Sequence, residues 1–69
     1  MSINNINNPA IIAEAVAAAI EEMKTMTNAE VHVLAGQWAQ LALQASWNQM
    51  SQAMATVYSD ENQRRIASK

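Results

Sequence analysis

The chain has 69 residues, 51% of them hydrophobic, with four Lys or Arg against six Asp or Glu, one His and no Cys. A chain of this length forms a single domain, 1–69, whose core supplies only about 3–5 kcal/mol unless disulfides, a metal or oligomerisation adds to it. Without Cys, oligomerisation is the remaining source of stability. The formal net charge of −2 argues against nucleic-acid binding, which needs clustered Lys and Arg.

The first predicted helix follows an uncharged, Asn-rich segment of eight residues. Asn favours turns and caps over helix interiors, so residues 1–8 are expected to form an extended arm. Asn8 is then suited to the N-cap and Pro9 to the first helical position, where a missing N–H has no consequence. Apolar residues recur on one face at three- and four-residue steps as far as Met26, which predicts a helix over residues 9–26.

The next segment has the spacing of a capping box. Thr27 precedes Glu30 by three residues, directly before an apolar run, which predicts that a second helix begins here. The alternative is a single helix that continues through residues 25–28, where neither Gly nor Pro interrupts it. The capping-box spacing favours the break, and two helices joined by a short connection usually pack antiparallel.

The second helix is predicted over residues 29–58, a stretch with no Pro and only one Gly. Two apolar stripes run along it, and the second is displaced by two residues, so one partner helix cannot cover both. The stripes are Val31, Leu34, Trp38, Leu41 and Ala45, followed by Leu43, Trp47, Met50, Met54 and Val57. At 1.5 Å per residue this helix reaches about 45 Å against about 27 Å for the first. The overhanging third, from Trp47 to Tyr58, would then need an intermolecular partner.

The C-terminal residues leave two interpretations open. Ser59 is suited either to start a short third helix or to lie within a continued second helix, and residues 60–68 are predicted as a helical tail in both cases. The predicted fold class is therefore all-α, an elongated helical hairpin that assembles laterally with other copies.

The stretch between Glu30 and Asp60 carries no formal charge unless His32 is protonated. An exposed helix of a soluble monomer normally carries charge on its outer face. A membrane span is unlikely because the stretch holds six amide side chains, which are costly to bury in hydrocarbon: Gln37, Gln40, Gln44, Asn48, Gln49 and Gln52. The pattern favours a helix covered by other copies of the protein, with small residues that permit close approach.

No constellation of residues indicates enzymatic chemistry. His32 has no Ser and Asp at a spacing that would build a catalytic triad, and an interface histidine is the simpler interpretation. An oxygen-rich cation loop and the glycines of phosphate loops are also missing. We therefore expect no catalytic residues, no cofactor and no metal. No basic segment followed by an apolar one precedes the first helix, so a cytoplasmic location is expected.

Three stretches resemble a known family: residues 33–42 (VLAGQWAQLA), 48–53 (NQMSQA) and 8–16 (NPAIIAEAV), with Asn62-Gln63 further on. Together they are similar to the short Ala/Gln-rich "killing trait" proteins of refractile bodies (R-bodies). The chain departs from the family at two places. The family often has an aromatic-Gln pair where this chain has Trp38-Ala39-Gln40, and a Gln-rich run where this chain has Asp60-Glu61-Asn62-Gln63. The resemblance implies a cytoplasmic protein that polymerises into a ribbon, coiled when stored and extended by a trigger such as low pH.

The sequence thus leads to the hypothesis of a structural subunit that assembles with itself, and in the R-body case with paralogous small subunits. The predicted assembly interface comprises Gly36, Trp38, Ala39, Leu41, Ala42, Leu43, Trp47, Met50, Met54 and Val57. The candidates for a pH switch are Glu21, Glu22, Glu30 and His32. Basic residues near the C-terminus, Arg64 and Arg65 among them, are expected to pair with acidic residues of neighbouring subunits. The alternative hypothesis is a small homo-oligomeric helical bundle that acts as a binding module, a regulator or secretion partner.

Overall fold

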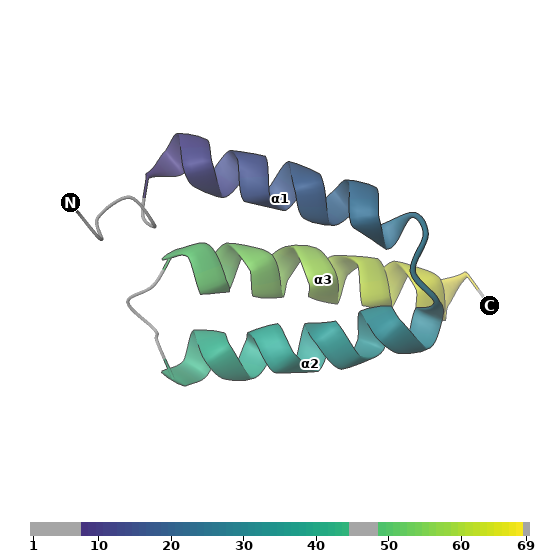
Figure 1. Ribbon diagram of the computed structural model, residues 1–69. Helices are drawn as coiled ribbons and strands as arrows, with labels where there is room; N and C mark the ends of the chain where they lie inside the picture. Colours follow the sequence, from purple (N-terminus) through teal and green to yellow (C-terminus); the bar gives the residue numbers. More distant parts are fainter. Residues whose placement is uncertain (1–7, 45–48, 69) are drawn as a thin grey trace.

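The computed structural model describes residues 8–44 and 49–68, and all elements in these ranges are helices (Figure 1). Helix α1 spans Pro9–Met23, α2 spans Asn28–Gln44 and α3 spans Gln49–Ala67. Helices α1 and α3 run in the same direction and α2 runs against both. The predicted all-α fold class is confirmed.

Helix α1 begins where the sequence predicts and ends three residues earlier. The Asn8 side chain accepts a hydrogen bond from the backbone N–H of Ala10 at 2.9 Å, and Pro9 occupies the first turn. After Met23 the backbone changes to bonds between residues three apart: the N–H of Lys24 donates to the carbonyl of Glu21 at 3.2 Å, and that of Met26 to Met23 at 3.2 Å. These tighter turns end the α-helix before residue 26.

The predicted break between the first two helices is confirmed, together with its capping box. The backbone N–H of Thr27 donates to the carboxylate of Glu30 at 2.9 Å, and the N–H of Glu30 donates to the Thr27 hydroxyl at 3.2 Å. Two N–H groups at the start of α2 thereby gain partners that the helix itself cannot provide.

The prediction of one helix over residues 29–58 is wrong. Helix α2 ends at Gln44, α3 begins at Gln49, and the two pack against each other in antiparallel orientation (Figure 1). A single helix would have left its second stripe in water, whereas the antiparallel pair packs most described members of both stripes in one core: Val31, Leu34 and Trp38 of the first, and Met50, Met54 and Val57 of the second. Leu41 and Leu43 stay exposed. The two-residue displacement between the stripes therefore reflects a change from one helix, α2, to another, α3. Ala45 and Trp47 lie outside the described residues.

The C-terminal tail and the overhang are also settled by this arrangement. Helix α3 continues through Ser59 as far as Ala67, so the predicted tail at residues 60–68 is the end of α3. The predicted overhang does not exist, because Met54 and Tyr58 are buried inside the single chain, at 8% and 4% exposure. Met54 and Tyr58 therefore need no intermolecular partner for their burial.

The core is small and draws on all three helices. Its buried hydrophobic residues are Ala19 and Met23 of α1, Val31 and Ala35 of α2, and Met54 and Tyr58 of α3. Partly buried side chains pack around them: Ala15, Val16, Met26, Leu34, Trp38, Met50 and Val57. Among the described residues, Val31 is the only large side chain that is fully buried.

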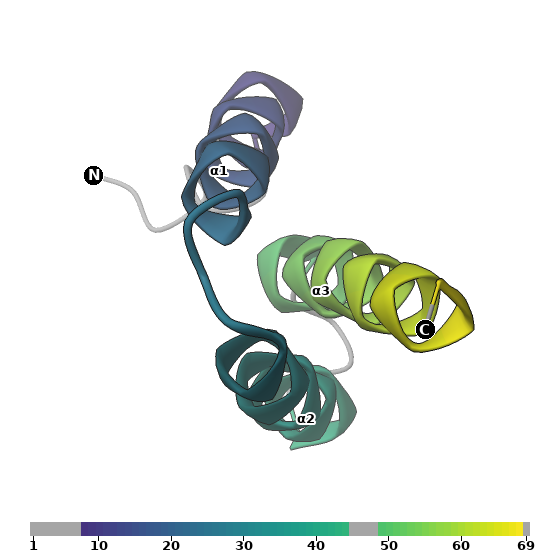
Figure 2. The same cartoon turned by 90° about the vertical axis from the view of Figure 1, so that its right-hand side faces the viewer.

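The three helices form an open arrangement. Helices α1 and α2 each pack on α3 and lie apart from one another, as the end view shows (Figure 2). The described part of the chain measures 44 × 23 × 15 Å, and its radius of gyration is 12.5 Å. A compact domain of this length has a radius of gyration of about 11 Å. The molecule is therefore elongated.

Candidate functional site

The surface exposes an unusual number of large apolar side chains for so short a chain. They are Ile11 and Ile20 of α1, Val33, Leu41 and Leu43 of α2, and Ile66 of α3. Leu43 is 81% exposed, more than any other member of this set. Single exposed apolar residues are common, so only the places where they meet uncharged neighbours are informative.

One flank of α2 forms the first of these places, which we call the small-residue face. Gly36, Ala39 and Leu43 lie on it at three- and four-residue steps, and all three are exposed. Ala39 and Leu43, with Ala42 of α2 and Gln52, Ala55 and Thr56 of α3, line a shallow hollow of about 530 Å³. None of these residues is charged, so a second protein surface can cover this face without burying an ion.

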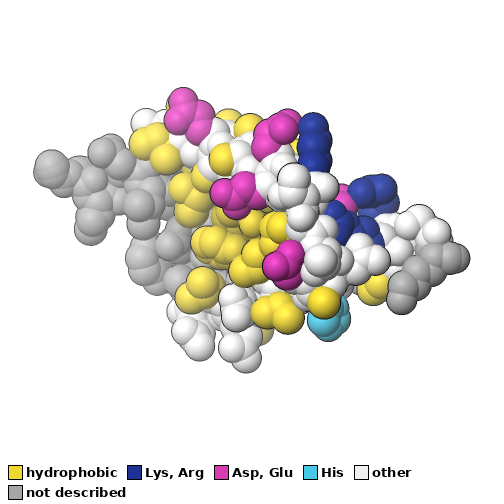
Figure 3. Space-filling model, turned by 45° about the vertical axis from the view of Figure 1, so that its right-hand side comes forward, with side chains coloured by type: hydrophobic (Ala, Val, Ile, Leu, Met, Phe, Trp, Pro, Cys, Tyr) yellow, Lys and Arg dark blue, Asp and Glu magenta, His cyan; other side chains and the backbone are white. Residues whose placement is uncertain are grey.

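The second place is the apolar area between α1 and α2, which we call the groove (Figure 3). It includes an open hollow of about 440 Å³ lined by Met26 of the connection and by residues of α2: Ala29, Glu30, Val33, Leu34 and Gln37. Leu41 continues this row one and two turns beyond Gln37 and Leu34. Figure 3 shows hydrophobic side chains gathered in the middle of this side of the molecule, with acidic side chains beside them.

The structure divides the predicted assembly interface among surface, boundary and core. Gly36, Ala39, Leu41 and Leu43 are exposed, although Leu41 belongs to the groove and the others to the small-residue face. Trp38, Ala42, Met50 and Val57 are partly buried. Met54 belongs to the core of the single chain and offers no surface to a neighbour. Trp47 lies outside the described residues.

Two of the pH-switch candidates have partners that define local structure. Glu30 caps α2 through Thr27. Nδ1 of His32 lies 3.3 Å from the side-chain amide nitrogen of Asn62, a contact that joins α2 to α3 next to the small-residue face.

The other two candidates lie on α1. Glu21 forms an exposed ion pair with Lys24 at 3.1 Å, one turn along the helix. Glu22 is exposed and lies close to α3: burial, and secondly the charge of Glu22, raise the pKa of the Tyr58 hydroxyl. The structure does not bring the four candidates together, since they are distributed over both flanks of the molecule.

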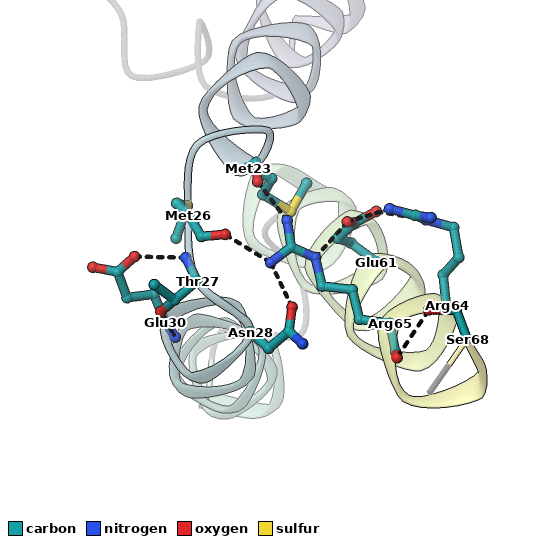
Figure 4. A network of polar contacts seen from close by, with 9 residues as sticks. All are labelled: Met23, Met26, Thr27, Asn28, Glu30, Glu61, Arg64, Arg65 and Ser68. Carbon is teal, nitrogen blue, oxygen red and sulfur yellow. Dashed lines mark hydrogen bonds and ion pairs between the residues drawn. The ribbon is translucent and has the colours of Figure 1, made fainter.

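Sequence reasoning missed a polar network that is centred on Arg65 (Figure 4). Its guanidinium donates to the carbonyls of Met23 at 2.5 Å and Met26 at 2.8 Å, to the side-chain oxygen of Asn28 at 3.0 Å, and to Glu61 at 2.6 Å. One side chain of α3 therefore binds the end of α1, the connection and the start of α2. No local pattern announces it, because these partners lie far from Arg65 in the chain.

Glu61 accepts from both arginines of α3. Hydrogen bonds from Arg64 and Arg65 lower the pKa of Glu61 to about 2, and Glu61 in turn raises the pKa of Arg64. The expected pairing of Arg64 and Arg65 with acidic residues of neighbouring subunits stays a prediction. Both arginines bond to Glu61 within the same helix, with N–O distances of 2.6 Å.

Within residues 8–44 and 49–68 there is no group of three or more His, Asp or Glu that could hold a metal ion. In the same part of the chain no helix is both long enough and apolar enough to cross a membrane. Comparisons of this chain with protein-family models, with curated proteins and with solved structures found no match.

Proposed function

We propose that this protein is a structural subunit that assembles with copies of itself through the small-residue face of α2. The observation that carries the proposal is the uncharged exterior of α2 beyond Glu30, where Leu43 is 81% exposed beside Gly36 and Ala39. A helix that stays in water normally has charged residues on this side. Small residues let a neighbouring backbone approach closely, and Leu43 supplies an apolar anchor.

The size of the core supports the same proposal. Two of the six buried hydrophobic residues are alanines, Ala19 and Ala35, which bury little area each. Small domains without disulfides or metals commonly gain stability by oligomerisation. Burial of α2 against other copies would add apolar area that the single chain leaves in water.

The resemblance to R-body proteins extends the proposal to the form of the assembly. In that case the subunits polymerise into a cytoplasmic ribbon, alone or with paralogous small subunits, and the ribbon changes shape at low pH. The His32–Asn62 contact lies beside the small-residue face, so it is the pH-sensitive group with the most direct access to the assembly contact. Glu21, Glu22 and Glu30 lie away from this face.

A closed homo-oligomeric bundle that acts as a binding module is the second candidate. The arrangement of the helices favours it, because α1 and α2 both pack on α3 and lie apart from one another (Figure 2). A helix from another copy, placed opposite α3, would complete a four-helix bundle. Shape separates the two candidates: a closed bundle keeps one mass at all concentrations, whereas a polymer grows.

Electron micrographs of the purified protein, with Ala39→Leu as the test variant, decide between them. We expect wild-type polymers, and fewer or none in the variant, because overpacking an interface costs about 1–3 kcal/mol per contact. Ala17→Leu is the matched control: Ala17 is equally exposed on α1, away from the small-residue face. Unchanged polymers in Ala39→Leu would show that this face is not the contact.

A further inference from the structure

The groove between α1 and α2 includes a largely apolar hollow on its α2 side, and acidic side chains lie beside the hydrophobic area (Figure 3). On the α2 side, Val33 is 52% and Leu41 is 47% exposed, and Leu34 lines the hollow between them. Glu30 lines the same hollow at its end nearest the connection. This side of α2 therefore combines an apolar row with one carboxylate.

Helix α1 contributes the opposite side of the groove. Ile20 and Lys24 line a different hollow, formed with Val57, Asp60 and Arg64 of α3, so they mark the flank of α1 that faces away from the groove. Two residues correspond to about 200° of rotation along a helix, which places Glu22 on the groove flank. The influence of Glu22 on the buried Tyr58 agrees with this placement.

The described basic side chains do not neutralise these carboxylates. Lys24 pairs with Glu21, Arg64 pairs with Glu61, and the Arg65 guanidinium is used by two backbone carbonyls, Asn28 and Glu61. In Figure 3 the basic side chains gather at one end of the molecule, whereas acidic side chains lie beside the hydrophobic area. The groove thus combines exposed apolar surface with two carboxylates, Glu22 and Glu30, that form no ion pair with a described basic side chain, although Glu30 also accepts the Thr27 N–H.

We infer that this groove binds a basic amphipathic helix of another protein, with the apolar stripe of that helix on Leu34 and Leu41 and its Lys or Arg residues toward Glu22 and Glu30. A helix in a hydrophobic groove is a common mode of recognition, and matched charges select the partner. A second copy of this chain fits less well: α1 and α3 carry carboxylates, α2 has no basic residue, and the described arginines are engaged within their own chain.

The test uses the full chain and a fluorescently labelled synthetic helix of about 18 residues, long enough to span the groove, with Leu on one face and Lys on the other. Two control peptides have Glu in place of Lys, or the same Leu and Lys in scrambled order. We expect saturable binding of the first peptide alone, by fluorescence anisotropy, and weaker binding as salt is raised. Equal binding of the Glu or the scrambled peptide, or no binding of any of them, would overturn the inference.

Matched variants locate the site. Glu22→Gln with Glu30→Gln removes two charges from the groove and keeps the cap of α2, since Gln also serves in a capping box. Its affinity should fall about five-fold. Glu21→Gln with Asp60→Asn removes two charges from the other flank and should leave the affinity unchanged. Equal losses in both pairs would show that net charge alone attracts the peptide. A fall in the bound fraction of the peptide as the protein concentration is raised would assign the groove to a second copy. Either result contradicts the inference.

Discussion

Arg65 is the residue on which the relative position of the helices most depends. A helix leaves its last carbonyls without partners, and the planar fork of Arg can reach several acceptors at once. The terminal nitrogens of Arg65 donate to Met23, Met26 and Asn28, and its Nε donates to Glu61. The Arg65 side chain is only 14% exposed. The attachment of α1 to the α2–α3 pair therefore has a polar component besides its small apolar contact.

Replacement of Arg65 by Lys should destabilise the fold although the charge is kept. A single ammonium cannot bond Met23, Met26 and Glu61 in the same geometry, and acceptors that lose their donor cost about 1–3 kcal/mol in total. The free energy of unfolding, from urea denaturation followed by circular dichroism, measures the effect. Arg64→Lys is the control, because the Arg64 side chain is 69% exposed and its guanidinium bonds Glu61 of its own helix. Equal losses in both variants would contradict the role given to Arg65.

Glu61 should produce a pH dependence of stability in strong acid. Its pKa is about 2 in the folded chain and 4.5 for an ordinary Glu, so its contribution is fully present above pH 4.5. That contribution is lost as the pH falls from 4.5 through 2, because the unfolded chain takes up the proton first. Urea denaturation at several pH values should show a smaller decrease over this window in Glu61→Gln than in the wild type. Parallel curves would mean that Glu61 is not the responsible group.

At the scale of the elements, α2 is the helix whose composition its own packing does not explain. Gly36 lies in its middle, is exposed, and has a φ that any residue adopts. A Cβ added there would meet nothing within 4 Å in the single chain. Gly in a helix is destabilising relative to Ala, and nothing in the single chain requires Gly at this position.

Gly36→Ala should therefore separate folding from assembly. The variant should raise the free energy of unfolding of the unassembled chain by about 0.5–1 kcal/mol. It should also reduce the fraction that pellets in a centrifuge, because the added methyl group would occupy the place of a neighbouring backbone. A variant that is more stable and pellets as the wild type does would show that no neighbour approaches Gly36.

Local signals in the sequence were sufficient for helix starts. The Asn8-Pro9 cap and the Thr27–Glu30 capping box are short-range patterns, and both are present in the structure. The reversal between Gln44 and Gln49 was missed because no Gly or Pro marks it. Its only signal was the displacement of the apolar stripe at Met50, Met54 and Val57, which is also compatible with a longer helix that contacts several partners.

The candidate sites were predictable to different degrees. The small-residue face follows from the composition of α2, since Gly36, Ala39 and Leu43 share one flank of any helix. The groove and the Arg65 network depend on how α1 lies on α3, which tertiary packing decides and the spacing of residues does not. The sequence pattern placed Met54 in an interface because burial inside one chain and burial between chains produce the same apolar spacing.

At the scale of the whole molecule, an elongated chain with a small core keeps apolar surface in contact with water. Leu43 at 81% exposure and the groove between α1 and α2 lie on different sides of the α2–α3 pair. Two separate surfaces allow one molecule to contact copies of itself on one side and a different partner on the other. The proposed assembly through the small-residue face would bury apolar surface of α2, Leu43 above all, that the single chain leaves in water.

Sedimentation velocity over a range of protein concentrations tests this claim most directly, with Leu43→Glu compared with Ile20→Glu. Both substitutions place a charge at an exposed apolar position, but Leu43 lies on the small-residue face and Ile20, 44% exposed, on the far flank of α1. We expect species that grow with concentration in the wild type and in Ile20→Glu, and a monomer in Leu43→Glu, because a buried unpaired charge opposes association. A wild-type protein that remains a monomer at every concentration would contradict it.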